Sequence, residues 1–251
     1  MKLKPYAALA AALLAMPPRP ARAQQAEAGF EGDSASAYLA VIEQAKKTAL
    51  PAFGNVPPGV MSDQQREMLV DTLPLFAGDR SGKETGDVIN LAFVGSEDEV
   101  EELLKSARWT PVPLSLGRSV RDLLGGRLNH FPPFSRMFVD GRPQAMNWNR
   151  PVTFESRHHF RLWRSGLAEP LGRRVWPGAG TFDRRVDWDK WDHVADPDVD
   201  KERAFIYASL VGNPLVARLT LVPSERLPRR WKSGRQSRFT DGRVLVVELL
   251  P

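Results

Sequence analysis

The feature that most constrains the fold is a change of apolar spacing near residue 87. Before it, apolar residues recur at helical intervals; after it, short apolar segments alternate with turn residues such as Asp140 and Gly141. We therefore expect an α+β fold, with a mixed or mainly antiparallel sheet and flanking helices, preceded by a small helical extension. The strands are expected at 88–94, 137–139, 145–148, 154–163, 175–182, 216–222 and 244–249.

Capping residues predict where the helices begin. The segments 62–65 (SDQQ) and 96–99 (SEDE) have the serine and the glutamine or glutamate of a capping box, each ahead of apolar residues at helical spacing. A later helix is expected to begin at Pro197 with Asp196 as its N-cap, because proline suits the first helical position. Apolar spacing predicts further helices over 34–45 and 119–124.

The first residues have the pattern of a secretory signal. Lys2 and Lys4 precede an apolar run over 7–16, and Ala-Arg-Ala at 21–23 fits a cleavage site. The run is about half of the roughly 20 residues that a bilayer-spanning helix needs. We expect a cleaved signal peptide over 1–23, and a periplasmic or secreted protein with a helical extension and linker over 24–86 and an α+β domain over 87–251.

Composition excludes several classes of function. Cleavage would remove four basic residues and no acidic one, so the formal net charge would fall from +5 to +1. A nearly neutral chain makes nucleic acid an unfavoured partner, because nucleic-acid binding needs a concentrated basic surface. The chain has no cysteine, which excludes thiolate nucleophiles, thiolate metal sites and disulfides.

Five motifs between Asp87 and Leu210 resemble, in order, those of the LssY C-terminal-like domain family. The resemblance implies an envelope-associated domain linked to secretion, and it names no reaction. Family members carry two histidines before the DPD segment, where this chain has Trp191, Asp192 and His193. The motifs are INLAFVGS, FVDGRPQAMNWNRP, RHHFRLWR, VWPGAGTFD and HVADPDVDKERAF.

The RHHFRLWR segment is the first candidate site. In a strand, alternation places Arg157, Arg161 and Trp163 on one face together with His159. Guanidinium groups bind phosphate and carboxylate in a bidentate manner, so these residues, with Arg142, predict a site for an anionic small molecule or lipid headgroup. The alternative is a solvated strand face that carries cross-strand pairs of arginine and acid.

A histidine and a carboxylate are the second candidate. If 154–164 and 175–183 pair with Arg164 opposite Val175, His158 lies diagonal to Asp183; a slip of one residue would instead place His159 on the face of Asp183. A carboxylate that orients an imidazole suits a general base, which predicts a hydrolase acting on an envelope ester or phosphoester. The alternative is a core histidine that is satisfied by its partner.

The acidic segment before and within the last expected helix suggests a cation site. Its aspartates do not fit an EF-hand, because Lys201 stands at the glycine position and Tyr207 at that of the bidentate glutamate. A divalent metal shared by His193, Asp196 and one of the paired histidines is the remaining metal hypothesis. Otherwise, Asp196 caps the helix and His193 is a loop residue.

A basic segment over 226–238 surrounds Trp231 and suits an anionic lipid surface, or else forms an exposed loop between two strands. Three functions therefore stay open at this level. They are binding of an anionic ligand, hydrolysis, and interaction with a secretion or lipid-handling membrane protein of the envelope. The last of these predicts an exposed apolar patch of several hundred square ångströms.

Overall fold

The structure, a computed structural model, describes residues 59–81, 84–112, 136–153, 156–167, 172–187, 192–233 and 236–250. All of these belong to one compact unit, Gln44–Pro251. The expected signal peptide and the helices expected over 34–45 and 119–124 lie outside the described residues. Among the helices that are described, none combines the length and the hydropathy needed to cross a membrane.

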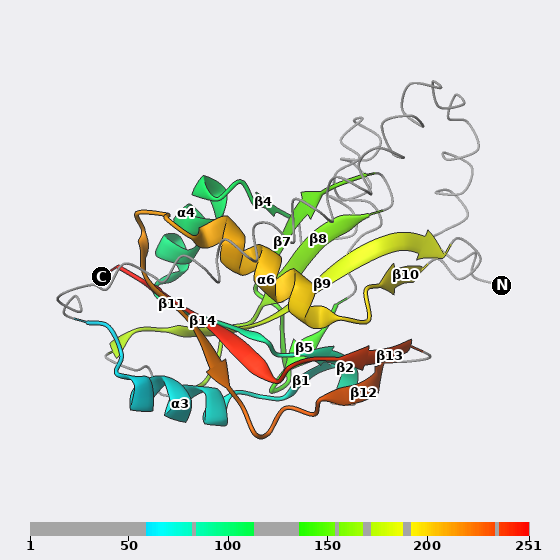
Figure 1. Ribbon diagram of the computed structural model, residues 1–251, viewed down its shortest axis with the longest axis horizontal. Coiled ribbons are helices and arrows are strands. Elements are labelled where there is room, and N and C mark those ends of the chain that lie inside the picture. Colours follow the sequence, from blue (N-terminus) through cyan, green and yellow to red (C-terminus); the bar gives the residue numbers. More distant parts are fainter. Residues whose placement is uncertain are drawn as a thin grey trace. The chain divides into compact units, whose positions relative to one another are not determined.

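The largest sheet of the described chain has eight strands (Figure 1). Its strand order is β11-β14-β3-β9-β8-β7-β4, and β10 pairs with β9. Every pairing is antiparallel except that of β14 with β3. The strands are β3 (Leu91–Val94), β4 (Thr110–Pro111), β7 (Met146–Pro151), β8 (Arg157–Leu162), β9 (Val175–Asp187), β10 (Asp192–Ala195), β11 (Val216–Pro223) and β14 (Arg243–Leu249).

Smaller elements cover both faces of this sheet. Helices α4 (Glu97–Ser106) and α6 (Val199–Leu210) share an apolar cluster with Leu91 and Phe93 of β3. The alternate residues Ala92 and Val94 belong to a second cluster, with α3 and a small sheet of order β2-β1-β5-β6. The remaining elements are α3 (Asp63–Thr72), β1 (Phe76–Gly78), β2 (Glu84–Val88), β5 (Phe138–Val139), β6 (Arg142–Pro143), β12 (Arg230–Ser233) and β13 (Gln236–Phe239).

This layering confirms the α+β class and explains the continuous apolar run of β3. A strand that is buried on both faces has no polar side to alternate with. The predicted capping boxes are also confirmed, since Ser62 and Ser96 each accept a hydrogen bond from the backbone of the third helical residue and receive its side chain in return. Both residues of the predicted turn, Asp140 and Gly141, have positive φ angles, of 49° and 72°.

The start of α6 differs from the expectation. Its N-cap is Asp198, not Asp196, and the first helical residue is Val199 rather than Pro197. The backbone N–H of Asp196 still donates to the carbonyl oxygen of Phe182, at 2.8 Å, so the chain is held against β9 at that point. The Asp196 carboxylate accepts the N–H of Asp198, at 2.9 Å, and turns the chain into the helix.

Two segments expected to be irregular form strands instead. The polar stretch 78–86, read as a linker, leads into β2, which pairs with β1. Gly86 has φ of 92°, and an added Cβ would lie 2.7 Å from that of Ser233, so the glycine permits close packing of two strands. The basic segment 226–238, for which an exposed loop was one of two interpretations, forms most of the antiparallel pair β12 and β13. Trp231 donates its indole N–H to the carbonyl oxygen of Gly86, at 2.7 Å.

Candidate functional site

The pairing of β8 with β9 decides which histidine meets Asp183. The partners are Arg157 with Asp183 and His159 with Thr181, one residue away from the predicted register. The predicted pairing of His158 with Asp183 is therefore wrong, and the slipped alternative holds. Gly178 explains the register: it lies opposite Leu162, and a Cβ there would come within 2.7 Å of the leucine side chain. The glycine must therefore lie beneath that leucine.

Asp183 is the centre of a buried group that we call the Asp183 network. It accepts a hydrogen bond from Nε of Arg157 at 3.0 Å, and Nδ1 of His159 and Nδ1 of His193 each lie 3.3 Å from the same oxygen, Oδ2. The side chains of Arg157 and Asp183 are each 5% exposed, and that of His159 is 4% exposed. The structure thus brings together three candidate catalytic and metal residues, in an interior position.

A second ion-pair group ties this face of the large sheet to the smaller elements. Arg161 of β8 and Arg238 of β13 each contact one oxygen of Asp87, at 3.0 Å. Asp87 belongs to β2, so its carboxylate links the two sheets through charge-assisted hydrogen bonds. The hypothesis of a solvated strand face is wrong, because Arg157 and Arg161 are buried, although the predicted cross-strand arginine and acid pair is present.

Hydrogen bonds and nearby charges influence the protonation of the Asp183 network. An Arg157 N–H faces Nε2 of His193 at 3.0 Å, and because a guanidinium only donates, the proton of His193 must sit on Nδ1, toward Asp183. Burial and the charges of Arg161 and Arg157 hold the pKa of His159 well below 6.5. Burial raises the pKa of the Asp183 carboxyl, and the Arg157 guanidinium opposes this rise.

The other predicted ligand and metal residues are dispersed. Trp163 is fully buried and donates its indole N–H to the carbonyl oxygen of Met137. Arg142 is exposed on β6, in the other sheet. Asp196 is occupied by the turn into α6 and by Lys201, whose Nζ lies 3.4 Å away.

The donor set does not fit the proposed divalent metal. Within the described part of the chain, no group of three or more histidine, aspartate or glutamate side chains is placed to hold a metal ion. A guanidinium occupies the position next to His193 Nε2 that a cation would need. Asp196 and His193 take part in separate sets of contacts.

His158 lies on the opposite face of β8 and forms the His158–Glu202 pair. Its Nδ1 is 2.6 Å from Oε2 of Glu202, a residue of α6 whose side chain is fully buried. The imidazole stacks on the ring of Phe205, with 3.5 Å between centroids and an interplanar angle of 3°. The His158 side chain retains 15% of its surface exposed. A buried carboxylate thus orients an imidazole that reaches the surface.

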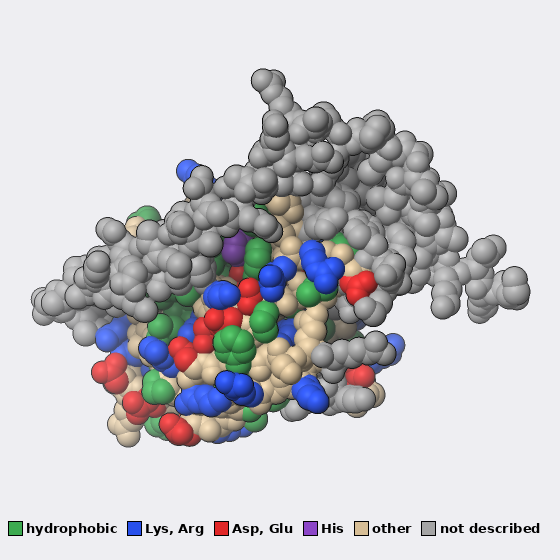
Figure 2. Space-filling model, turned by 45° about the vertical axis from the view of Figure 1, so that its right-hand side comes forward, with side chains coloured by type: hydrophobic (Ala, Val, Ile, Leu, Met, Phe, Trp, Pro, Cys, Tyr) green, Lys and Arg blue, Asp and Glu red, His purple; other side chains and the backbone are tan. Residues whose placement is uncertain are grey.

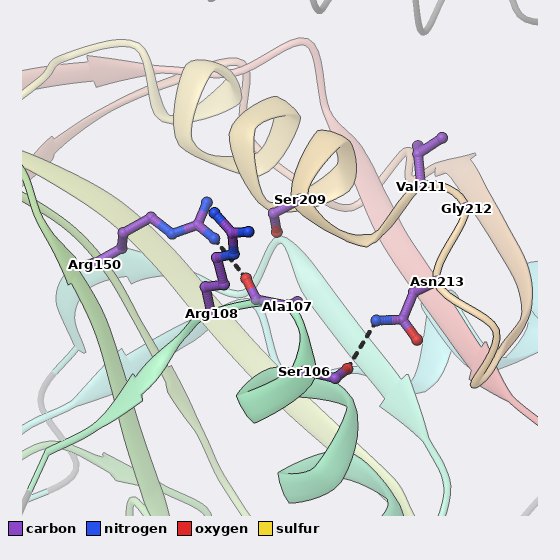
Figure 3. Close-up of a pocket in the computed structure, with 8 residues that line it drawn as sticks. All are labelled: Ser106, Ala107, Arg108, Arg150, Ser209, Val211, Gly212 and Asn213. Atoms are coloured by element: carbon purple, nitrogen blue, oxygen red, sulfur yellow. Dashed lines mark hydrogen bonds between the residues drawn. The ribbon is translucent and has the colours of Figure 1, made fainter.

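A surface cavity of about 360 Å³ is lined in part by Arg150, the cross-strand partner of His158, and we call it the arginine pocket. Figure 3 shows the guanidinium groups of Arg108 and Arg150 side by side at one end, with Ser106 and Asn213 at the other. None of the described residues that line it is acidic. Arg108 follows α4 with a φ angle of 64°, an uncommon conformation for a residue with a Cβ.

Sequence reasoning did not find the arginine pocket or the role of Glu202. One signal for Glu202 was present, since Val199, Ile206 and Leu210 predict the inward stripe of α6 and position 202 falls on that stripe. A glutamate at a core position predicts a buried partner. Arg108 and Arg150 had no comparable signal, because they come from segments 42 residues apart that only the fold brings together.

Comparison with known proteins agrees with the resemblance in the motifs. No match was found among curated proteins or among solved structures. The family model of the LssY C-terminus matches residues 70–244, from α3 to β14. This match covers more than half of the chain and includes all five motifs, the Asp183 network and the His158–Glu202 pair. The chain therefore belongs to the LssY C-terminus family.

Proposed function

We propose that this domain binds an anionic ligand carrying a phosphate or carboxylate group, in the arginine pocket. The observation that carries the proposal is the pair of adjacent guanidinium groups, Arg108 and Arg150, at a cavity without an acidic described lining residue. Guanidinium groups match the oxygen geometry of phosphate and carboxylate. An anion between them would offset their mutual repulsion.

Electrostatics around Arg150 support this assignment. Burial lowers its pKa, the charge of Arg108 lowers it further, and Glu202 opposes both. The guanidinium lies over the rings of Trp109 and Phe205, at 5.5 Å from each centroid, which fixes its position. A charge that is partly removed from water and held beside a like charge gains more from an anionic partner than a solvated one does.

The arginines of the Asp183 network are less suited to this task. Arg157 and Arg161 already pair with Asp183 and Asp87, and both are buried. An external anion would have to displace an internal carboxylate there. This moves the anion site from the face of β8 that the sequence suggested to the opposite face.

A structural role for Arg150 is the competing explanation. One of its N–H groups donates to the carbonyl oxygen of Ala107, at 2.5 Å, at the C-terminus of α4. Cations are favourable at helix C-termini, so Arg150 stabilises α4 with or without a ligand. A binding measurement distinguishes the two roles, because an arginine that only stabilises α4 gives no saturable anion binding.

The described surface gives less support to an interaction module. Basic, acidic and apolar side chains are interspersed on the face drawn in Figure 2. The exposed large apolar residues of the described chain come from separate segments: α3, the residue after α6, β11, β13 and the residue after β14. They are Met68, Val211, Leu221, Phe239 and Leu250.

The test is calorimetric titration of the purified protein with inorganic phosphate and with acetate. We expect saturable phosphate binding that weakens at least about tenfold in Arg150→Gln and in Arg108→Gln, since a charge-assisted hydrogen bond contributes about 1.5–3 kcal/mol. Arg185→Gln removes an exposed arginine elsewhere, on β9, and should leave the affinity unchanged. Equal phosphate affinity in all four proteins would contradict the proposal.

Export to the cell envelope is a separate proposal that rests on the leader pattern of residues 1–23. N-terminal sequencing of the protein from a periplasmic fraction should find a chain that starts near Gln24. Recovery of the uncleaved chain from the cytoplasmic fraction would contradict it.

A further inference from the structure

We propose that the His158–Glu202 pair is the acid–base group of a hydrolytic site for phosphate esters, with the ester phosphate held in the adjoining arginine pocket. This inference rests on the proposed anion binding and adds a reaction to it. The histidine of this pair, His158, lies on the face of the large sheet that is opposite the Asp183 network.

Strand pairing places the two parts of this site together. His158 of β8 and Arg150 of β7 are direct cross-strand partners, so their side chains leave the sheet on the same face, with Cβ atoms roughly 4.5–5.5 Å apart. Both also contact one ring: the His158 centroid is 3.5 Å from that of Phe205, and Cζ of Arg150 is 5.5 Å from it. A phosphate bound by Arg150 would therefore lie on the same face of the sheet as the imidazole.

The contacts of His158 suit proton transfer. Glu202, when ionised, only accepts, so the hydrogen bond of 2.6 Å places the His158 proton on Nδ1 and leaves Nε2 as the basic atom. Burial raises the pKa of the Glu202 carboxyl, and the His158 imidazole opposes this rise. Stacking on Phe205 holds the ring plane. A fixed tautomer and a fixed ring plane are what a general base requires.

The reaction would proceed with a balanced transfer of one proton. Nε2 of His158 takes a proton from water while the water oxygen bonds to phosphorus. The bond from phosphorus to the ester oxygen breaks, and the departing alcohol takes the proton from the imidazolium. The guanidinium groups hold the non-bridging oxygens, whose charge they stabilise in the transition state. Nothing is oxidised, and the products are an alcohol and a phosphate.

The close approach of α6 to the sheet brings Glu202 into contact with His158. Gly180 of β9 lies beneath α6, and a Cβ added there would be 2.9 Å from Ile206 Cδ1 and 3.3 Å from Glu202 Cγ. The glycine thus lets α6 approach the sheet closely enough for Glu202 to reach His158. The carboxylate is inaccessible, whereas the imidazole retains surface exposure.

The test measures release of p-nitrophenol from p-nitrophenyl phosphate and from bis(p-nitrophenyl) phosphate, with p-nitrophenyl acetate as an ester without phosphate. We expect turnover of at least one phosphate ester, and a kcat lower by about 10²-fold or more in His158→Gln. Phosphate affinity in that variant should stay within about threefold of the parent protein, because the guanidiniums remain. Arg185→Gln is the matched control and should keep full activity.

Two outcomes separate this inference from the proposed function. Phosphate binding without turnover of either phosphate ester, or with turnover that His158→Gln leaves intact, overturns the hydrolytic site and leaves anion binding in place. Absence of phosphate binding in the parent protein overturns both the hydrolytic site and the proposed anion binding. Glu202→Gln supplies a further readout: it should lower kcat and shift the pH–rate profile, whereas a residue with a merely structural role would leave the profile of the folded protein unchanged.

Discussion

Asp183→Asn should be strongly destabilising, because it leaves the buried guanidinium of Arg157 without a counter-ion. The atoms Nε of Arg157 and Oδ2 of Asp183 are 3.0 Å apart, and both side chains are 5% exposed. Removal of one partner of such a buried pair costs about 3–5 kcal/mol. Since whole domains are stable by only about 5–15 kcal/mol, the variant should lose a large part of its free energy of unfolding.

Urea denaturation followed by tryptophan fluorescence measures this loss. Glu101→Gln is the control, since the Lys105–Glu101 pair is similarly short, at 2.6 Å, but its side chains are 54% and 40% exposed. It should cost less than about 1 kcal/mol. In the double variant Arg157→Met with Asp183→Leu, the loss should be smaller than the sum of the two single losses. An Asp183→Asn loss no larger than that of the control would refute the reasoning.

Three further predictions concern protonation, packing and capping. Because the pKa of His159 is depressed in the folded protein, its contribution to stability is present above pH 6.5 and is lost as the pH falls below 6.5. Below pH 6.5 the free energy of unfolding should decrease by up to about 1.4 kcal/mol per pH unit. In urea titrations at several pH values, His159→Gln should flatten that slope. Gly178→Ala should cost about 1–3 kcal/mol, because its Cβ would press on Leu162; a neutral thermal shift would contradict this. Ser96→Ala should lower stability by about 1 kcal/mol through loss of the α4 capping box, and an unchanged melting temperature would count against that role.

Local signals predicted much of the fold. The capping boxes at Ser62 and Ser96 were found because a serine and its partner three residues later form them without help from the rest of the chain. Strand β14 was found because four of its apolar residues are contiguous, and the first part of β9 was found because its residues are mostly apolar and bounded by turn residues. By contrast, β12 and β13 carry basic residues typical of a loop, and only contacts such as that of Arg238 with Asp87 make them a paired element.

The candidate site was predicted less well, because it depends on register and on distant partners. A shift of one residue between β8 and β9 placed His159, not His158, beside Asp183, and the sequence contains no signal that measures the packing of Leu162 over Gly178. The sequence did predict that Arg157, His159 and Arg161 share one face. It did not show that the smaller sheet and β13 bury that face.

The most direct test of anion binding is a crystal structure of the protein soaked in tungstate, a phosphate analogue that scatters anomalously. We predict an anomalous peak in the arginine pocket, within hydrogen-bond distance of the guanidinium groups of both Arg108 and Arg150, and its loss in crystals of Arg150→Gln. Tungstate bound only at other positions, with this pocket filled by water, would contradict the central claim.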